Sequence, residues 1–247
     1  MTLAMIATMV VLLLLGFPMM IPLLAATFVA FFGFFSGISP DIMVQQMLAG
    51  IRPAALTAVP MFILAADIIT KGHSADRLLD LIMKFAGHVK GGLGVTAAAT
   101  CTLFGAVSGS TQATVVAIGG PLRPRMLQAG YKDSYVLALI VNASDIAMLI
   151  PPSIAMIVYG VVSGTSISEL FIAGVGPGLL ILALFSAYSV AYAYIYDIPT
   201  QAKATWAERR DVLRSAVWPL GFPVIIVGGI YGGVFSPTEA AAVCVLY

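Results

Sequence analysis

The sequence predicts an all-α protein that crosses a lipid bilayer several times, and its composition excludes an ordinary soluble domain. Of the 247 residues, 60% are hydrophobic and only 9% are charged, whereas a soluble domain carries roughly 25% charged residues. Too few polar groups remain to cover a globular surface, so lipid must shield much of the chain from water. Two interruptions of the apolar segments further predict a re-entrant helical hairpin and a discontinuous helix.

The charge balance and the cysteines exclude several other classes of protein. Twelve basic and 11 acidic residues leave a net charge of +1, which predicts no nucleic-acid partner. Cys101 and Cys244 each lie in an apolar run without a neighbouring histidine, so we expect neither a disulfide nor a zinc site. No basic segment precedes the first apolar run, so no cleavable signal peptide is expected.

Residues 1–70 are expected to form scaffold helices. The segment Gly16–Pro18 divides the first apolar run, which predicts two short helices over Leu3–Leu15 and Met19–Phe35. The next predicted span covers Gln45–Thr70.

Two prolines, Pro53 and Pro60, are expected to bend this third span, because proline removes a backbone donor and clashes with the preceding turn. Asp67 lies close to the end of the span and is interpreted as an interfacial residue.

Residues 71–90 predict an amphipathic helix on the cytoplasmic surface of the membrane. Leu78, Leu79 and Phe85 recur at helical spacing between charged residues. A helix of this kind places its apolar face in the membrane interface.

Residues 91–122 form an apolar run with a polar, helix-breaking centre at Ser108–Thr111. Basic residues flank the run on both sides, at Lys90 and Arg123. A hairpin that enters and leaves from the cytoplasm keeps both flanks inside, as positively charged loops prefer. We therefore predict a re-entrant hairpin with this tip; the alternative is one long tilted helix with small residues for packing.

Residues 134–163 would form one ordinary span, but polar residues and two consecutive prolines interrupt the middle. Prolines in succession break a helix. We expect one half-helix up to about Asn142, an unwound segment, and a second half-helix from Ser153. Together with the hairpin, this discontinuous helix is the predicted transport domain.

Residues 164–247 are expected to form connecting helices. Leu170–Tyr196 should cross the membrane, Trp206–Ser215 should lie on the cytoplasmic surface, and Trp218–Val234 should cross again. A further helix begins near Pro237.

Hairpin tips and helix breaks offer free carbonyls, side-chain oxygens and helix N-termini inside a membrane, where they hold ions and substrates. Hard cations such as sodium take several oxygen ligands. The candidate sodium ligands are Ser108, Gly109, Ser110, Thr111, Asn142, Ser144 and Asp145. The candidate substrate-binding residues are Ser110, Thr111, Pro152 and Ser153.

Asp145 is the only charged residue between Asp133 and Glu169. An acid within a membrane segment predicts a function, because burying it unpaired is costly. Three roles remain open: a cation ligand, a proton carrier, or a partner for a basic group outside this chain.

Enzymatic functions have little support in the sequence. Ser108 lies in a Gly-Ala-Val-Ser-Gly segment, but both histidines, His73 and His88, lie outside the apolar spans, so no base is evident for it. HExxH and Walker A motifs are also missing from the sequence. A passive channel remains an alternative, since channels also use re-entrant hairpins, although the half-helix pattern favours a carrier.

An ordered set of motifs resembles the large membrane subunit (DctM type) of TRAP transporters, the tripartite ATP-independent periplasmic carriers. The resemblance covers essentially the whole chain. The motifs are Gly105–Thr114, Gly130-Tyr131, Leu149–Ile154, Tyr159-Gly160, Leu170–Gly174, Pro177-Gly178 and Phe235–Ala242.

This resemblance implies a multi-pass carrier of the bacterial cytoplasmic (inner) membrane, with inverted repeats and a sodium-driven elevator mechanism. It also implies a small four-helix membrane subunit and a periplasmic substrate-binding protein as partners. The substrate would be an organic acid of the sialic acid or C4-dicarboxylate type. Family members are longer, so the chain is expected to hold the first repeat and the start of the second.

The sequence departs from many members of that family before the double proline, where they carry a Gly/Thr-rich segment. This chain has Asn142–Met148 there instead. A direct transfer of backbone ligands at this segment is therefore in doubt. The preference for sialic acid over a C4-dicarboxylate rests on no particular residue.

Overall fold

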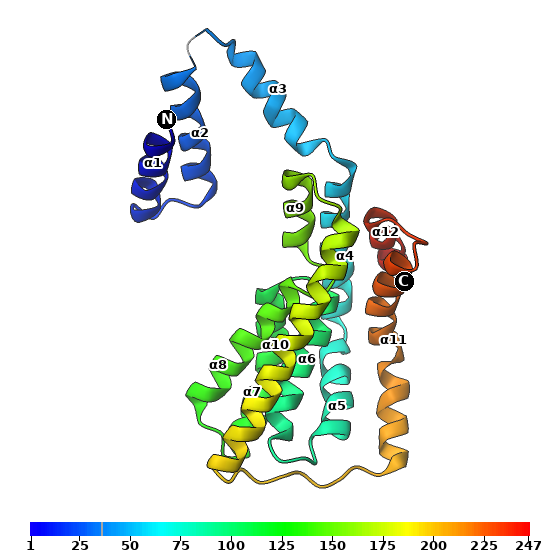
Figure 1. Cartoon of the computed structure of the whole chain (residues 1–247). Helices are drawn as coiled ribbons and strands as arrows, with labels where there is room; N and C mark the ends of the chain where they lie inside the picture. Colours follow the sequence, from blue (N-terminus) through cyan, green and yellow to red (C-terminus); the bar gives the residue numbers. More distant parts are fainter. Residues whose placement is uncertain (36) are drawn as a thin grey trace. The chain divides into compact units, whose positions relative to one another are not determined.

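The computed structural model describes every residue except Ser36, and the described residues form helices joined by short turns, without a strand (Figure 1). The chain divides into two units, Met1–Arg52 and Pro53–Tyr247. Within the described residues, three helical stretches are long and apolar enough to cross a membrane: Ala54–Lys71, Ile167–Ile195 and Trp206–Tyr231. The predicted all-α class is confirmed.

The first unit contains α1 (Thr2–Leu14), α2 (Met20–Phe34) and α3 (Pro40–Ile51). The two short N-terminal helices were predicted, and their turn contains Gly16 at a φ of +81°. Most apolar side chains of α1 and α2 are exposed, as expected of helices that face lipid or another protein.

The predicted third span is wrong as a single bent helix. The helix in the first part of this span, α3, ends at Ile51. After Pro53 the chain forms a short 3₁₀ turn, η1 (Ala54–Thr57), and then α4 (Ala58–Lys71). Pro53 cannot donate to the preceding turn, so the helix stops there. Pro60 lies in the first turn of α4, where its missing N–H has no partner to lose.

The second unit is built around a helical hairpin, α6 (Gly92–Ser108) and α7 (Thr111–Gln128). Nearly every residue of α6 is buried, because α5, α7, α8 and α10 all pack against it. Small residues permit this close packing. A Cβ added to Gly94 would lie 2.6 Å from Cβ of Ser189, and one added to Gly105 would lie 2.6 Å from Cβ of Ala147.

The helix α5 (Ser74–Ala86) forms where an amphipathic helix was predicted, and protein covers much of its apolar face. Leu78 and Leu79 are 1% and 0% exposed, within the core around α6. The amphipathic pattern shows that one face is covered, and protein rather than lipid covers it here. Figure 1 shows α5 beside α6 and α11.

The discontinuous helix was predicted and is present. It consists of α8 (Asp133–Ser144), the 3₁₀ turn η2 (Asp145–Met148) and α9 (Ile154–Ser163). The prolines lie between η2 and α9. The second half-helix begins one residue after Ser153, which caps it.

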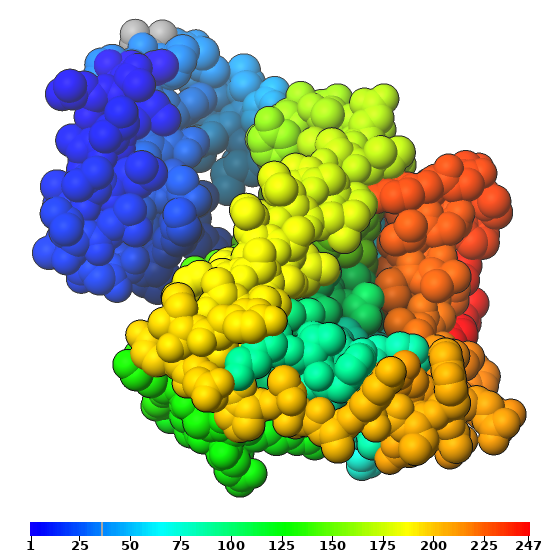
Figure 2. Space-filling view, turned by 60° about the horizontal axis from the view of Figure 1, so that its bottom comes forward, coloured from blue at the N-terminus to red at the C-terminus, as the bar shows by residue number. Residues whose placement is uncertain are grey.

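The chain continues with α10 (Ile167–Ile195), α11 (Trp206–Tyr231) and α12 (Pro237–Leu246). The connection from α10 to α11 runs across one end of this unit (Figure 2). At this end Lys90 Nζ lies 2.7 Å from a carboxylate oxygen of Asp197.

The predicted division at Trp206–Ser215 and Trp218–Val234 is wrong, because one continuous helix runs from Trp206 through the gap between the segments to Tyr231. The prolines within α11, Pro219 and Pro223, do not break it. Pro219 is buried and the helix packs against α5 and α12, so packing holds the helical path despite the missing backbone bonds.

Candidate functional site

The hairpin tip turns over two residues, Gly109 and Ser110. Gly109 has a φ of +60°, a left-handed conformation that glycine adopts without strain. Ser110 is extended and caps α7, and its Oγ accepts a hydrogen bond from the amide of Ala113 at 3.5 Å. Ser108 Oγ lies 3.0 Å from Oγ1 of Thr114, so the tip is also tied to the first turn of α7.

The main chain of the tip, at Gly109, contacts the main chain of the break in the discontinuous helix, at Pro152. A Cβ added to Gly109 would lie 2.6 Å from the carbonyl oxygen of Pro152. Ser153 is buried, and its Oγ accepts a hydrogen bond from the amide of Met156 at 3.3 Å. Two helices, α7 and α9, therefore begin at this contact, and each N-terminus carries a partial positive charge.

A cavity of about 360 Å³ adjoins the tip, and we call it the tip cavity. Its lining residues come from the tip, from the start of α9 and from α4. They are Ser108, Ser110, Ala113, Ile154, Ile63, Ala66, Asp67 and Thr70. Thr111, beside this lining, has a buried hydroxyl without a hydrogen-bond partner in the described part of the chain.

Asp67 and Thr70 line the tip cavity, and the sequence analysis did not place them beside the hairpin tip. Asp67 forms an ion pair with Lys71 at 2.7 Å, and its side chain is 53% exposed. Asp67 was interpreted as interfacial because it lies close to the end of its predicted span. The signal that favoured a site was that Asp67 is the only acid between Asp41 and Asp76.

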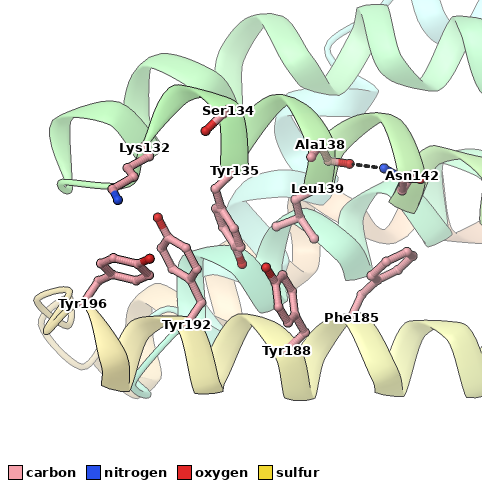
Figure 3. Close-up of a pocket in the computed structure, with 10 residues that line it drawn as sticks. All are labelled: Lys132, Ser134, Tyr135, Ala138, Leu139, Asn142, Phe185, Tyr188, Tyr192 and Tyr196. Atoms are coloured by element: carbon pink, nitrogen blue, oxygen red, sulfur yellow. Dashed lines mark hydrogen bonds between the residues drawn. The ribbon is translucent and has the colours of Figure 1, made fainter.

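The candidate ligands from α8 and η2 point elsewhere. Ser144 is buried and donates hydrogen bonds to the carbonyl of Ile140 at 2.7 Å and to Sγ of Cys101 at 3.6 Å. Asn142 donates to the carbonyl of Ala138 at 2.7 Å and lines a separate pocket between α8 and α10 (Figure 3). The structure forms no hydrogen bond between these residues and the described tip.

Asp145 is exposed at the start of η2. It makes no hydrogen bond or ion pair with any described side chain, which leaves all three of its predicted roles as predictions. The same 3₁₀ turn packs Ala147 against Gly105, one turn of α6 before the tip. The break of the discontinuous helix therefore contacts the hairpin along α6 as well as at the tip.

An apolar, all-helical chain in which a hairpin tip meets the break of a discontinuous helix defines a class of protein, the membrane carriers. Residues 6–247 match the family model of the tripartite ATP-independent periplasmic transporter, DctM component. The chain belongs to this family, as its motifs predicted.

Several curated relatives are large permease proteins of TRAP transporters. The ectoine/5-hydroxyectoine permease of Ruegeria pomeroyi is 71% identical over 241 residues, which cover 97% of this chain and 56% of that protein. The ectoine permease of Halomonas elongata is 67% identical over 248 residues, covering 100% of this chain and 58% of the relative.

A C4-dicarboxylate permease of Rhodobacter capsulatus is 36% identical over 252 residues, covering 96% of this chain and 57% of the relative. The chain thus spans somewhat more than half the length of the relatives it matches. These relatives are transporter permeases and not enzymes. The more similar pair is named for ectoine, so the predicted sialic acid or dicarboxylate preference finds no support there.

Proposed function

We propose that this chain is the large membrane subunit of an importer of ectoine or 5-hydroxyectoine in the bacterial inner membrane. Its partners would be a small membrane subunit and a periplasmic protein that delivers the substrate. Identities of 71% and 67% to permeases named for these solutes support the substrate. The observation that carries the proposal is the tip cavity, which is lined by the hairpin tip, the start of α9 and Asp67 of α4.

The chemistry of the tip cavity suits such a solute. Ectoine is a cyclic amidinium carboxylate, a zwitterion without net charge, so burying it costs less than burying a lone ion. The carboxylate of Asp67 would face the amidinium group. The N-termini of α7 and α9, capped by Ser110 and Ser153, would face the substrate carboxylate together with the unpartnered hydroxyl of Thr111.

Coupling to sodium is part of the same proposal. The sequence has no nucleotide-binding motif, so uphill import would use an ion gradient, and the oxygens of Ser108, Ser110 and Thr111 are of the type that hard cations take. The hairpin would enter from the cytoplasm. It would move with the discontinuous helix as an elevator against a scaffold that includes residues 1–70.

The test is uptake of radiolabelled ectoine into proteoliposomes that contain the full transporter. We expect uptake only with the binding protein outside and an inward sodium gradient, with little inhibition by sialic acid or a C4-dicarboxylate. Uptake without the binding protein would indicate a conventional carrier. Flux without a gradient would indicate a channel.

One substitution tests whether this uptake depends on the tip cavity. Asp67→Asn should lower ectoine uptake at least tenfold, since hydrogen bonds to charged groups are worth roughly 1.5–3 kcal/mol. Asp76→Asn removes an exposed acid in the first turn of α5, outside the cavity lining, and should leave uptake unchanged. Equal uptake by the two variants would contradict the role of Asp67.

A further inference from the structure

A second cavity lies between α8 and α10, on the opposite arm of the discontinuous helix from α9 (Figure 3). Its volume is about 440 Å³, and we call it the tyrosine pocket. One wall is aromatic, and the other carries polar groups. The lining residues are Lys132, Ser134, Tyr135, Ala138, Leu139, Asn142, Phe185, Tyr188, Tyr192 and Tyr196.

The aromatic wall is held in place by stacking between the two helices. The rings of Tyr135 and Tyr192 stack with centroids 3.8 Å apart, and those of Tyr192 and Tyr196 are 4.4 Å apart. Tyr188 continues the row, 5.8 Å from Tyr135, and is 59% exposed. Stacked rings lose little entropy on binding, so this wall is a preformed surface for a flat ligand.

A hydroxyl within this wall lacks a partner. Tyr192 is 8% exposed, and its hydroxyl makes no hydrogen bond with any described residue. The neighbouring hydroxyl of Tyr135, by contrast, donates to Ser189 at 2.9 Å. A buried hydroxyl without a partner is destabilising. In Figure 3 the hydroxyl of Tyr192 points toward the side of the pocket that holds Lys132 and Ser134.

The pocket also carries a positive charge at its rim, on the exposed side chain of Lys132. Lys132 Nζ lies 4.5 Å from the centroid of the Tyr196 ring and forms no ion pair with a described acid. The nearby acids are engaged by other bases. Arg123 holds Asp133 through two bonds of 2.8 Å and lowers the pKa of that carboxyl, and Lys90 lowers the pKa of Asp197 in the same way.

We propose that the tyrosine pocket is a second substrate site, for a small cyclic zwitterion that carries a carboxylate and a delocalised cation. The carboxylate would bind Lys132 and the hydroxyl of Tyr192. The flat ring would lie on Tyr188, and the cation would face the side-chain oxygen of Asn142 at the other end. The ligand class rests on the proposed function, which also places this pocket on the cytoplasmic side, where substrate leaves.

A lipid is the main competing occupant, and the distribution of polar groups argues against it. The phosphate of a lipid would suit Lys132, but its acyl chain would then lie along Asn142 and the hydroxyl of Tyr188 without satisfying either group. A short ligand with polar groups at both ends pairs with both ends of the pocket.

The test is equilibrium binding of radiolabelled ectoine to the transporter in nanodiscs, in the Asp67→Asn background that disables the tip cavity. Tyr192→Phe and Lys132→Gln should each weaken the remaining binding about tenfold, the loss of one charge-assisted hydrogen bond. The matched controls are Tyr194→Phe and Lys203→Gln, which lie outside the lining and should bind like the parent.

A thermal melt separates binding from folding. Tyr192→Phe removes only an unpartnered hydroxyl, so its melting temperature should equal or exceed that of the parent while its affinity falls. Unchanged affinity in both Tyr192→Phe and Lys132→Gln would overturn the site. A phospholipid that copurifies with the parent, is lost in Lys132→Gln and is not displaced by ectoine would overturn it in favour of lipid.

Failure of this site is distinguishable from failure of the proposed function. If the transporter does not import ectoine but Tyr192→Phe still weakens ectoine binding, the proposed function fails and the pocket stands. If import is normal and these variants bind like the parent, the pocket fails alone.

Discussion

At the scale of single residues, Gly109 makes the contact between the hairpin tip and the break of the discontinuous helix. Two costs oppose a side chain there. The positive φ costs an alanine about 1 kcal/mol, and its Cβ would also lie 2.6 Å from the carbonyl oxygen of Pro152. Gly164 has a similar φ, +72°, but open space around it.

We therefore expect Gly109→Ala to lower the melting temperature of the protein well beyond Gly164→Ala. The difference between the two variants reports the contact with Pro152, because both carry the same backbone strain. Thermal unfolding of the purified variants checks this. Equal melting temperatures would mean that the tip does not press on the break.

Two serines of the predicted ion site should respond differently to substitution. Ser108 lines the tip cavity, whereas the hydroxyl of Ser144 is buried and bonded to Ile140 and Cys101. Ser108→Ala should raise the sodium concentration for half-maximal uptake, because a lost oxygen ligand is not replaced at low dielectric. Ser144→Ala should leave that concentration unchanged. A shift in Ser144→Ala alone would place the ion at η2.

At the scale of elements, substitutions in α5 test whether its apolar face packs against protein or against lipid. Leu79 is fully buried in the core around α6. Leu79→Ala should destabilise the protein by about 2–5 kcal/mol, as cavities in packed cores do. Leu180→Ala on α10, where the side chain is 61% exposed, should cost much less. Denaturant unfolding in detergent measures both, and similar small losses would restore the membrane-surface interpretation of α5.

The breaks in the helices could be predicted from the sequence because their causes are local. Pro152 and its neighbour stop a helix wherever they occur, and Ser110 and Ser153 are residues that cap one. The burial of α5 could not be predicted, because an amphipathic pattern does not show which element covers the apolar face. The continuity of α11 could not be predicted either, because the sequence does not show which helices pack beside its prolines. Asp67 was interpreted from its position along a span, and the sequence does not show that the hairpin tip lies beside it.

At the scale of the whole molecule, the two basic flanks of the hairpin make the topology testable. Lys90 precedes α6 and Arg123 lies in the last turns of α7, so a hairpin places both at its base. Single cysteines at positions 90 and 123 should resist an impermeant thiol reagent added from outside intact cells. A cysteine in place of Ser166, in the turn between α9 and α10, should react. Labelling of position 90 or 123 alone would mean that the hairpin is a through-span.

The joint between Gly109 and Pro152 is made by main-chain atoms, whereas two of the groups proposed to recognise a solute are side chains on other helices: Asp67 on α4 and Tyr192 on α10. The contact between tip and break and the proposed recognition by α4 and α10 therefore depend on different atoms. Side chains on α4 and α10 can therefore be exchanged without altering the main-chain contact between Gly109 and Pro152. Re-engineering this permease for another solute should therefore start from α4 and α10 and leave residues 108–111 and 151–153 untouched.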